Sequence, residues 1–188
     1  MTTLAPTISA RLFPALSSRL RDVSLVLAGS LLMALCAQIV IPLQPVPITG
    51  QTFGVLLVGA ALGSKRGAAA MLAYIFEGAL GLPFFAGGTS GLGILTGATA
   101  GYLVGFIAAA YVIGLLAERG LERSIRTSLA PFLIGTIIIY VFGVSWLAIV
   151  LGSLGKAVSL GLTPFLAGDA IKLVAAAMAL PIAWKFVK

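Results

Sequence analysis

Hydrophobic residues fill six long stretches of the chain, and short polar or Pro- and Gly-rich segments separate them. A helix needs about 20 apolar residues to cross the hydrocarbon core of a bilayer. The pattern therefore predicts six membrane-spanning helices. They are expected over residues 23–41, 52–63, 67–82, 94–117, 129–154 and 163–184. The second would be only about 18 Å long at a rise of 1.5 Å per residue, so we expect a short span there.

Prolines mark several of the expected helix boundaries. Pro42 should stop the first helix and Pro83 should follow the third, because proline cannot continue a helix. Thr163 and Pro164 are expected as the N-cap and first residue of the last helix. The preceding residues, 155–163, are expected to form a loop. We expect a cytoplasmic N-terminal segment over residues 1–22 and a single six-helix transmembrane domain over residues 23–186.

The composition supports this fold class and excludes others. Of the 188 residues, 60% are hydrophobic and 9% charged, against about 45–50% and 25% in soluble domains. Histidine is absent and Cys36 is the only cysteine, so we expect no metal site, no disulfide framework and no His-based triad. The 12 Lys and Arg are too scattered for a nucleic-acid surface. The sequence thus predicts an all-α integral membrane protein that is not an enzyme and has no cofactor.

Basic residues predict the orientation in the lipid bilayer. Most Lys and Arg precede the first helix or follow the second, fourth and sixth. Because cytoplasmic segments carry the excess of Lys and Arg, both termini are expected to be cytoplasmic. The loops at residues 42–51, 83–93 and 155–163 should then face outward.

Three charged residues, Glu77, Asp169 and Lys172, fall inside predicted spans. Each costs roughly 2.5–3.5 kcal/mol at a helix centre, so we expect them to face the protein interior. Asp169 and Lys172 are three residues apart and should share one helix face. Glu77 should lie about 7 Å below the outer end of its helix. Four possibilities remain open for Glu77. It could lie at the membrane interface, contact Lys172, carry a neutral carboxyl group or contact a ligand.

Other polar side chains extend this layer at the outer ends of the helices. Gln51, Tyr74 and Thr96 belong to it, beneath two uncharged loops. The loop residues of interest are Pro45, Pro47, Gly87, Gly88 and Gly91. The sequence therefore predicts a ligand pocket that opens outward, with these loops as lids. The alternative, that Asp169 and Lys172 only neutralise each other as a buried structural pair, remains open.

Several runs of residues resemble the BioY family, the biotin-specific S components of energy-coupling factor (ECF) transporters. The runs are Pro47-Ile48-Thr49-Gly50-Gln51-Thr52, Gly81-Leu82-Pro83-Phe84-Phe85-Ala86-Gly87-Gly88, Gly97-Ala98-Thr99-Ala100-Gly101-Tyr102-Leu103-Val104-Gly105-Phe106 and Pro164-Phe165-Leu166-Ala167-Gly168-Asp169-Ala170-Ile171-Lys172. The resemblance covers residues 25–185 in order. It implies a multi-pass protein of the bacterial or archaeal cytoplasmic membrane that binds biotin from outside. It also implies two cytoplasmic ATPase subunits and a transmembrane coupling subunit as partners, and some family members are thought to act without them as oligomers.

The resemblance also assigns roles to single residues. Asp169 and Lys172 match the acidic and basic pair that contributes to the family's biotin site. Ser30 with Ala34 is the nearest equivalent of the small-residue surface that S components present to the coupling subunit. Glu77 departs from the family, in which this position is usually apolar.

The polar residues also suit the chemistry of biotin, which would be a transported ligand and not a cofactor. Its ureido ring needs both acceptors and donors, and its tail ends in a carboxylate. We expect Lys172 to offset the ligand's charge and Asp169 to accept a ureido N–H, although the two roles could be exchanged. The chain has no P-loop, so we expect that it hydrolyses no nucleotide itself and that energy for uptake comes from elsewhere. The alternative is a stand-alone facilitative or proton-coupled small-molecule carrier, with Glu77 or Asp169 as the titrating group.

Overall fold

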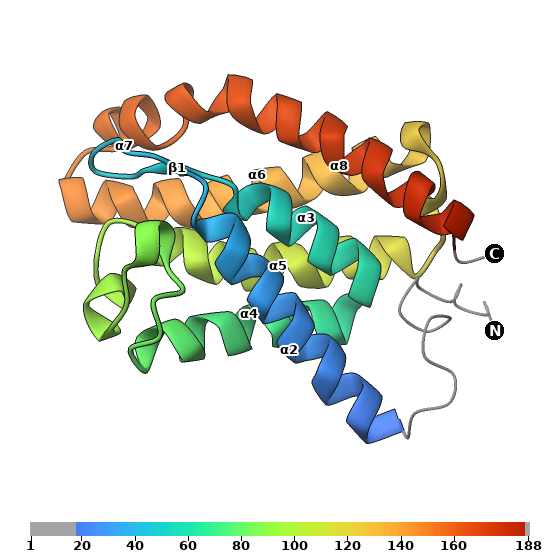
Figure 1. Cartoon of the computed structure of the whole chain (residues 1–188). Coiled ribbons are helices and arrows are strands. Elements are labelled where there is room, and N and C mark those ends of the chain that lie inside the picture. The colour runs from blue at the N-terminus through green and yellow to red at the C-terminus, as the bar shows by residue number, and fades with distance from the viewer. Residues whose placement is uncertain (1–17, 187–188) are drawn as a thin grey trace.

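A computed structural model describes residues 18–186, with side chains described for residues 19–182. The part of the predicted N-terminal segment before residue 18 lies outside the described residues. Six long helices form a bundle (Figure 1). They are α2 (Ser18–Ala37), α3 (Gln51–Leu62), α4 (Ser64–Ala79), α5 (Ala100–Ala117), α6 (Ile125–Leu151) and α8 (Leu166–Phe186). The predicted all-α architecture with six long helices is confirmed.

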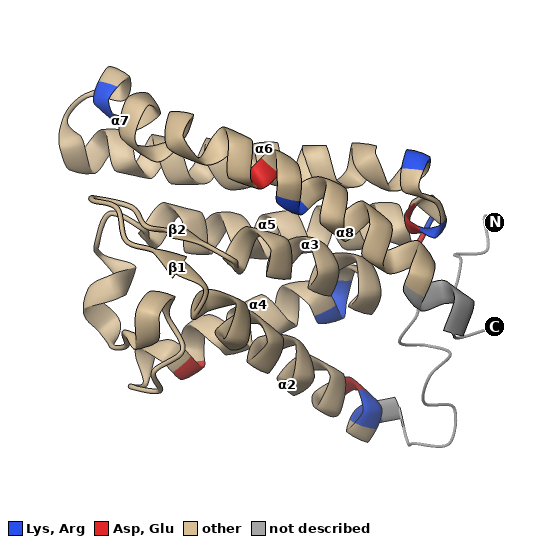
Figure 2. Ribbon diagram, turned by 45° about the horizontal axis from the view of Figure 1, so that its top comes forward, with Lys and Arg blue, Asp and Glu red and all other residues tan. Residues whose placement is uncertain are grey.

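Helix length and composition agree with a membrane location. Four segments are long and apolar enough to span a bilayer, at residues 19–37, 100–117, 125–151 and 154–182. Helix α3, with 12 residues, is short, as expected. The start of α2 and the end of α8 lie at one end of the bundle, where Figure 2 shows most of the Lys and Arg residues. This arrangement matches the orientation predicted from the basic residues.

Helix α5 runs through the middle of the bundle, between α4 and α6 (Figure 1). Its residues Ala109, Ala110 and Ile113 are fully buried. They belong to one hydrophobic core with Met71 of α4 and Ile139 of α6. Many large apolar side chains on the outside of the bundle are exposed, as expected for a surface that faces lipid acyl chains.

The cytoplasmic end of α5 packs closely against the turn between α3 and α4. A Cβ atom on Gly114 would lie 2.3 Å from the backbone nitrogen of Ser64, so only glycine permits this approach. The Glu118 carboxylate accepts hydrogen bonds of 2.8 Å from both the backbone N–H and the hydroxyl of Ser64. Glu118 therefore caps the N-terminus of α4 from a different helix.

The first helix ends earlier than Pro42, contrary to the prediction. Helix α2 stops at Ala37, and the chain then forms a small antiparallel hairpin of β1 (Val40–Ile41) and β2 (Ile48–Thr49). Val40 pairs with Thr49 and Ile41 with Ile48. Residues 40–41 are extended because they pair with residues 48–49. The periodicity of apolar residues alone does not indicate this pairing.

Two helices on the outer side also have different bounds from those predicted. Helix α4 ends at Ala79 instead of residue 82, so Glu77 lies in its last turn, nearer the outer end than expected. Helix α5 begins at Ala100 instead of residue 94. The residues between them include two 3-10 turns, η1 (Ala86–Gly88) and η2 (Leu92–Leu95). The many glycines in this segment oppose a continuous helix because glycine lowers helix stability.

The segment before the last helix is helical, so the predicted loop at residues 155–163 is wrong. After α6 ends at Leu151, residues Leu154–Gly161 form α7, whose N-terminus is capped by Ser153. A 3-10 turn, η4 (Thr163–Phe165), leads into α8. Thr163 does not act as an N-cap, because its hydroxyl donates backward to the Val158 carbonyl. On the cytoplasmic side, a further 3-10 turn, η3 (Leu121–Arg123), joins α5 to α6.

Candidate functional site

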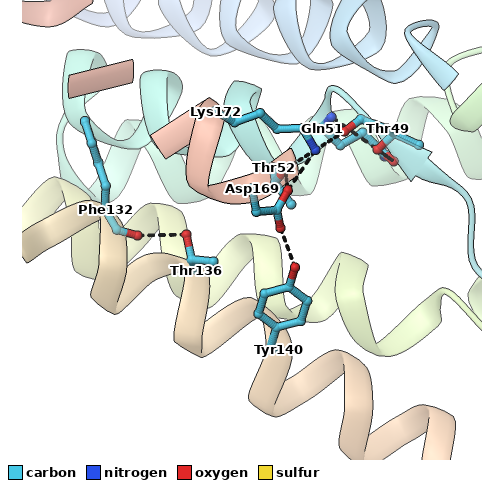
Figure 3. Close-up of polar contacts among 8 residues, drawn as sticks. All are labelled: Thr49, Gln51, Thr52, Phe132, Thr136, Tyr140, Asp169 and Lys172. Atoms are coloured by element: carbon cyan, nitrogen blue, oxygen red, sulfur yellow. Dashed lines mark hydrogen bonds and ion pairs between the residues drawn. The ribbon is translucent and has the colours of Figure 1, made fainter. Parts of the chain in front are cut away.

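Asp169 and Lys172 form a buried ion pair on α8, as their spacing predicts. Lys172 Nζ lies 2.8 Å from Asp169 Oδ1. Asp169 is only 5% exposed, and the Lys172 side chain is 19% exposed. The pair faces α3 and α6 from the outer half of α8 (Figure 3).

The segment that joins β2 to α3 completes the surroundings of Lys172. The ammonium group donates to the Thr49 carbonyl oxygen at 2.6 Å, to the Thr52 hydroxyl at 3.0 Å and to Asp169. The Thr52 hydroxyl in turn donates to Asp169 Oδ1 at 2.9 Å. An ammonium group has three N–H donors, so all the donors of Lys172 have acceptors within the protein.

Tyr140 of α6 is a member of this network that the sequence analysis missed. Its hydroxyl donates to Asp169 Oδ2 at 2.5 Å (Figure 3). The signal in the sequence is a single tyrosine that directly follows the aliphatic run Ile137-Ile138-Ile139. A tyrosine hydroxyl in an apolar span needs a hydrogen-bond partner, but the partner's identity depends on how α6 and α8 pack.

Gln51 lies beside this network, and Tyr74 lies behind it. The Gln51 side chain accepts from the Thr49 hydroxyl at 2.9 Å and donates to the Tyr74 hydroxyl at 2.7 Å. Tyr74 is fully buried and makes an edge contact with the ring of Phe85. Tyr74, which was predicted to bind the ligand, is not among the residues that line the two cavities described below, and its hydroxyl bonds to Gln51.

Two adjoining cavities lie between these side chains and the outer loops. The inner one, of about 50 Å³, is lined by the polar network together with aromatic and aliphatic residues. The outer one, of about 290 Å³, is lined mainly by apolar and glycine residues of residues 85–98. Five residues line both cavities, namely Pro47, Gln51, Ala86, Thr99 and Leu103. The two cavities therefore adjoin each other, the inner one beside the polar network and the outer one mainly apolar.

The two predicted lid loops border this site to different extents. Pro45 and Pro47 line the outer cavity, and Pro47 also lines the inner one. Gly87, Gly88 and Gly91 line neither cavity, and they have φ angles of 65°, 76° and 97°, which suit glycine. These glycines therefore shape the loop but do not provide its inner surface.

Neighbouring side chains hold the loops in place. Gln38 Nε2, at the end of α2, lies 3.5 Å from the carbonyl oxygens of Pro83 and Phe85. The Trp146 indole of α6 donates to the Gly97 carbonyl at 2.9 Å. The Tyr102 hydroxyl donates to the Gly161 carbonyl at 2.7 Å, which fixes the end of α7 against α5. The segment that lines the outer cavity is therefore attached both to the residue that follows α2 and to α6.

Thr96 and Glu77 lie outside the two cavities. The Thr96 hydroxyl donates to the Gly93 carbonyl of its own loop, and Thr99 takes its place in the cavity lining. Glu77 is half-buried near the outer end of α4. The contact with Lys172 that was considered for it does not form, because Lys172 pairs with Asp169. Glu77 Oε2 is buried and has no hydrogen-bond partner among the described residues.

The predicted partner surface on the first helix faces inward. Ser30 is fully buried, with its hydroxyl bonded to the Leu27 carbonyl, and Ala34 is 6% exposed. Both side chains pack within this chain, so neither presents a surface to another subunit in this conformation. The exposed large apolar side chains of α2 include Leu27, Leu31 and Leu35 instead.

The helices form an apolar bundle, and a pocket on its outer side contains the Asp169–Lys172 ion pair. These features are those of an integral membrane protein with a site for a small solute. The chain belongs to the BioY family, whose model matches residues 7–188. It is 46% identical over 147 residues to Biotin transporter BioY of Thermotoga maritima, covering 78% of this chain and 86% of that protein. It is 42% identical over 141 residues to Biotin transporter BioY of Rhizobium etli, covering 71% and 75%.

The fold also has a counterpart among solved structures. A 2.1 Å crystal structure of the S-component for biotin from an ECF-type ABC transporter superposes with a TM-score of 0.76. The likeness covers 91% of this chain and 95% of that chain, at 24% sequence identity. At this identity the match establishes the shared fold.

Proposed function

We propose that this chain binds biotin on the outer side of the cytoplasmic membrane and serves as the substrate-binding subunit for its uptake. The observation that carries the proposal is membership of the BioY family, with relatives named as biotin transporters at 46% and 42% identity. The family is one of transporters, not enzymes. Biotin is thus the transported ligand and not a cofactor.

Pocket size supports a ligand that occupies both cavities. Sites for small molecules typically measure roughly 300–1,000 Å³. The inner cavity, of about 50 Å³, is far below this range, and the outer one, of about 290 Å³, only approaches it. We infer that biotin extends from the polar network of the inner cavity into the mainly apolar outer cavity.

The hydrogen bonds favour the ureido ring at the inner end. Among the residues that the structure describes, Tyr140 is the one donor to Asp169 Oδ2, so this oxygen has a lone pair left for a ureido N–H. The Tyr140 hydroxyl can also accept one hydrogen bond. Lys172 was expected to offset the ligand's charge, but its three donors are already engaged. Binding a carboxylate there would break one of these bonds.

We place the biotin carboxylate in the outer cavity for the same reason. Thr99, at the N-terminal end of α5, lines both cavities and can donate through its hydroxyl. The second N–H of the Gln51 amide is also available, since the first donates to Tyr74. The apolar body of biotin would then contact Leu103 and Pro47, which line both cavities.

The chain has no nucleotide-binding motif, so ATP hydrolysis would have to be supplied by other subunits. We propose two cytoplasmic ATPase subunits and a transmembrane coupling subunit as partners. The shared fold with an ECF-type S-component supports this assembly.

A biotin titration of the detergent-purified protein tests the proposal. Trp146 is the reporter, because its indole bonds to Gly97, which lines the outer cavity. We expect saturable quenching with the wild-type protein. The affinity for biotin should fall at least tenfold in Asp169→Asn and in Lys172→Ala. Glu77→Gln is the matched control, because Glu77 lines neither cavity, and it should stay within about twofold of wild type. If both α8 variants also stay within twofold, the proposed site is wrong.

A liposome assay separates the proposal from the alternative of a stand-alone carrier. The substrate-binding subunit should bind biotin without accumulating it when a proton gradient is imposed across vesicles that lack other subunits. Accumulation that depends on the gradient would instead identify a proton-coupled carrier.

A further inference from the structure

An apolar groove of about 320 Å³ lies between α2, α3 and α8, and it shares no lining residue with the two cavities of the proposed biotin site. Its walls are aliphatic and include Leu25, Ala28, Leu32, Leu57, Ala61 and Ala179. From the start of α2 at Ser18, Leu25 lies about 10 Å and Leu32 about 21 Å along the helix. The groove is thus at the depth of the acyl chains of the cytoplasmic leaflet.

An excess of positive charge lies at the cytoplasmic end of this groove. Arg21 precedes Leu25 by four residues, so it occupies the same face of α2, one turn closer to the cytoplasm. Figure 2 shows charged residues at the starts of both α2 and α4, at the same end of the bundle. Arg21 and these charged residues therefore lie toward the cytoplasmic end of the bundle from Leu25, which lines the groove.

One carboxylate serves two guanidinium groups there. Asp22 Oδ1 lies 2.8 Å from both Nε and Nη2 of Arg66, but 4.0 Å from Nε of Arg21. Arg21 Nε is buried and has no hydrogen-bond partner among the described residues. Arg66 thus holds the Asp22 carboxylate at hydrogen-bond distance, and Arg21 pairs with the same carboxylate only at 4.0 Å, so two guanidinium groups share one negative charge.

We propose that the groove and Arg21 together bind one anionic phospholipid of the cytoplasmic leaflet. An acyl chain fills the groove, because an aliphatic cavity stays dry and accepts apolar ligands. The phosphate contacts the Arg21 guanidinium, whose planar donors match phosphate oxygens. Basic sites between helices on the cytoplasmic side are suited to anionic headgroups. An apolar helix of another protein would fill the groove but would supply no anion for Arg21.

Native mass spectrometry of the full-length, detergent-purified protein tests this proposal. Dioleoyl phosphatidylglycerol and dioleoyl phosphatidylcholine, which have the same acyl chains, are titrated separately. We expect one bound phosphatidylglycerol at saturation, with at least fivefold tighter binding than phosphatidylcholine. Arg21→Gln should remove this preference by weakening phosphatidylglycerol binding about fivefold. Ala28→Trp, which fills the groove from an exposed position, should weaken the binding of both lipids at least tenfold.

Two matched controls change the same residue types at exposed positions near the start of α6. Arg126→Gln and Ala130→Trp should leave phosphatidylglycerol binding within about twofold of wild type. A biotin titration of each variant confirms that it is folded, since neither Arg21 nor Ala28 lines the proposed biotin site. If Ala28→Trp fails this check, Arg21→Gln still tests the phosphate contact.

Three outcomes would overturn the proposal. Equal affinity for the two lipids would show that no anion is selected. Equal loss in the control variants would identify only non-specific boundary lipid. Unchanged lipid binding in Ala28→Trp, together with loss of a co-expressed coupling subunit during purification, would assign the groove to a protein helix.

Discussion

The outer and cytoplasmic ends of the bundle both contain charged side chains, but their surroundings differ. At the outer end, Asp169 is almost fully buried and receives hydrogen bonds from residues of α3, α6 and α8 beside an open cavity. At the cytoplasmic end, the side chains of Asp22 and Arg66 are 47% and 24% exposed, and they join only the starts of α2 and α4. The outer pair lines a cavity and belongs to the proposed biotin site, whereas the cytoplasmic pair joins two helices.

The difference in burial sets the expected energies. An exposed ion pair contributes about 0–1 kcal/mol, because water and salt screen it. Removing one partner of a buried pair costs about 3–5 kcal/mol, because the remaining charge has no counter-ion. Substitutions at the two ends should therefore differ several-fold in their effect on stability, and only the outer ones should affect biotin binding.

Lys172→Met should have the largest effect. It leaves Asp169 buried without a cation, so we expect a loss of about 3–5 kcal/mol in the free energy of unfolding. Biotin binding should also fall below detection. Thermal unfolding in detergent and the biotin titration measure the two effects.

The double variant Asp169→Leu with Lys172→Met serves as the control. Replacing a whole buried ion pair with apolar residues is often close to neutral, so most of the lost stability should return while biotin binding stays absent. Normal biotin binding in the double variant would contradict the proposed site and support a purely structural pair.

Tyr140→Phe should have the next largest effect. It removes a hydrogen bond to a charged acceptor, worth about 1.5–3 kcal/mol. We expect biotin affinity to fall at least tenfold, with a smaller loss of stability than in Lys172→Met. Tyr111→Phe is the matched control, because Tyr111 is 43% exposed on α5 and lines neither cavity. Equal affinities in the two variants would exclude Tyr140 from the site.

Glu118→Ala should have an intermediate effect on stability and none on binding. Loss of this cap from the N-terminus of α4 should cost about 1 kcal/mol. Biotin affinity should remain within about twofold, because Glu118 lies at the opposite end of the bundle. A tenfold loss of affinity at unchanged melting temperature would show that the two ends are coupled.

Asp22→Asn should have the smallest effect, below about 1 kcal/mol. The difference from wild type should shrink further at high salt, because exposed charges are screened. Melting curves at low and high ionic strength measure this trend. A salt-independent loss of several kcal/mol would show that the Asp22–Arg66 pair is more buried in the membrane than its exposure in the structure indicates.

The sequence alone predicted the features that depend on residues close together in the chain. Asp169 and Lys172 are one helical turn apart, so their contact followed from periodicity, and the cost of charge in lipid indicated that they point inward. The short α3 and the orientation of the helices likewise followed from residue counts and the positions of Lys and Arg. The resemblance to the BioY family added the ligand, which chemistry alone left open.

The remaining features depend on contacts between distant residues. Tyr140 contacts Asp169 because α6 packs against α8, and Tyr74 is buried with its hydroxyl bonded to the Gln51 amide. The hairpin forms because residues 40–41 pair with residues 48–49. Ser30 and Ala34 were expected on a partner surface, but both are buried in this structure. The spacing of small residues does not show which side of a helix packs against the rest of the same chain.

The contact between Lys172 and the hairpin involves the backbone oxygen of Thr49, not its side chain. Every residue type has this oxygen, so the contact depends on the register of the two strands and not on which amino acid occupies position 49. Most substitutions in the hairpin should therefore preserve it. Insertion or deletion of a residue within a strand would move the oxygen away from α8, and length changes are thus better tolerated in the turn between the strands.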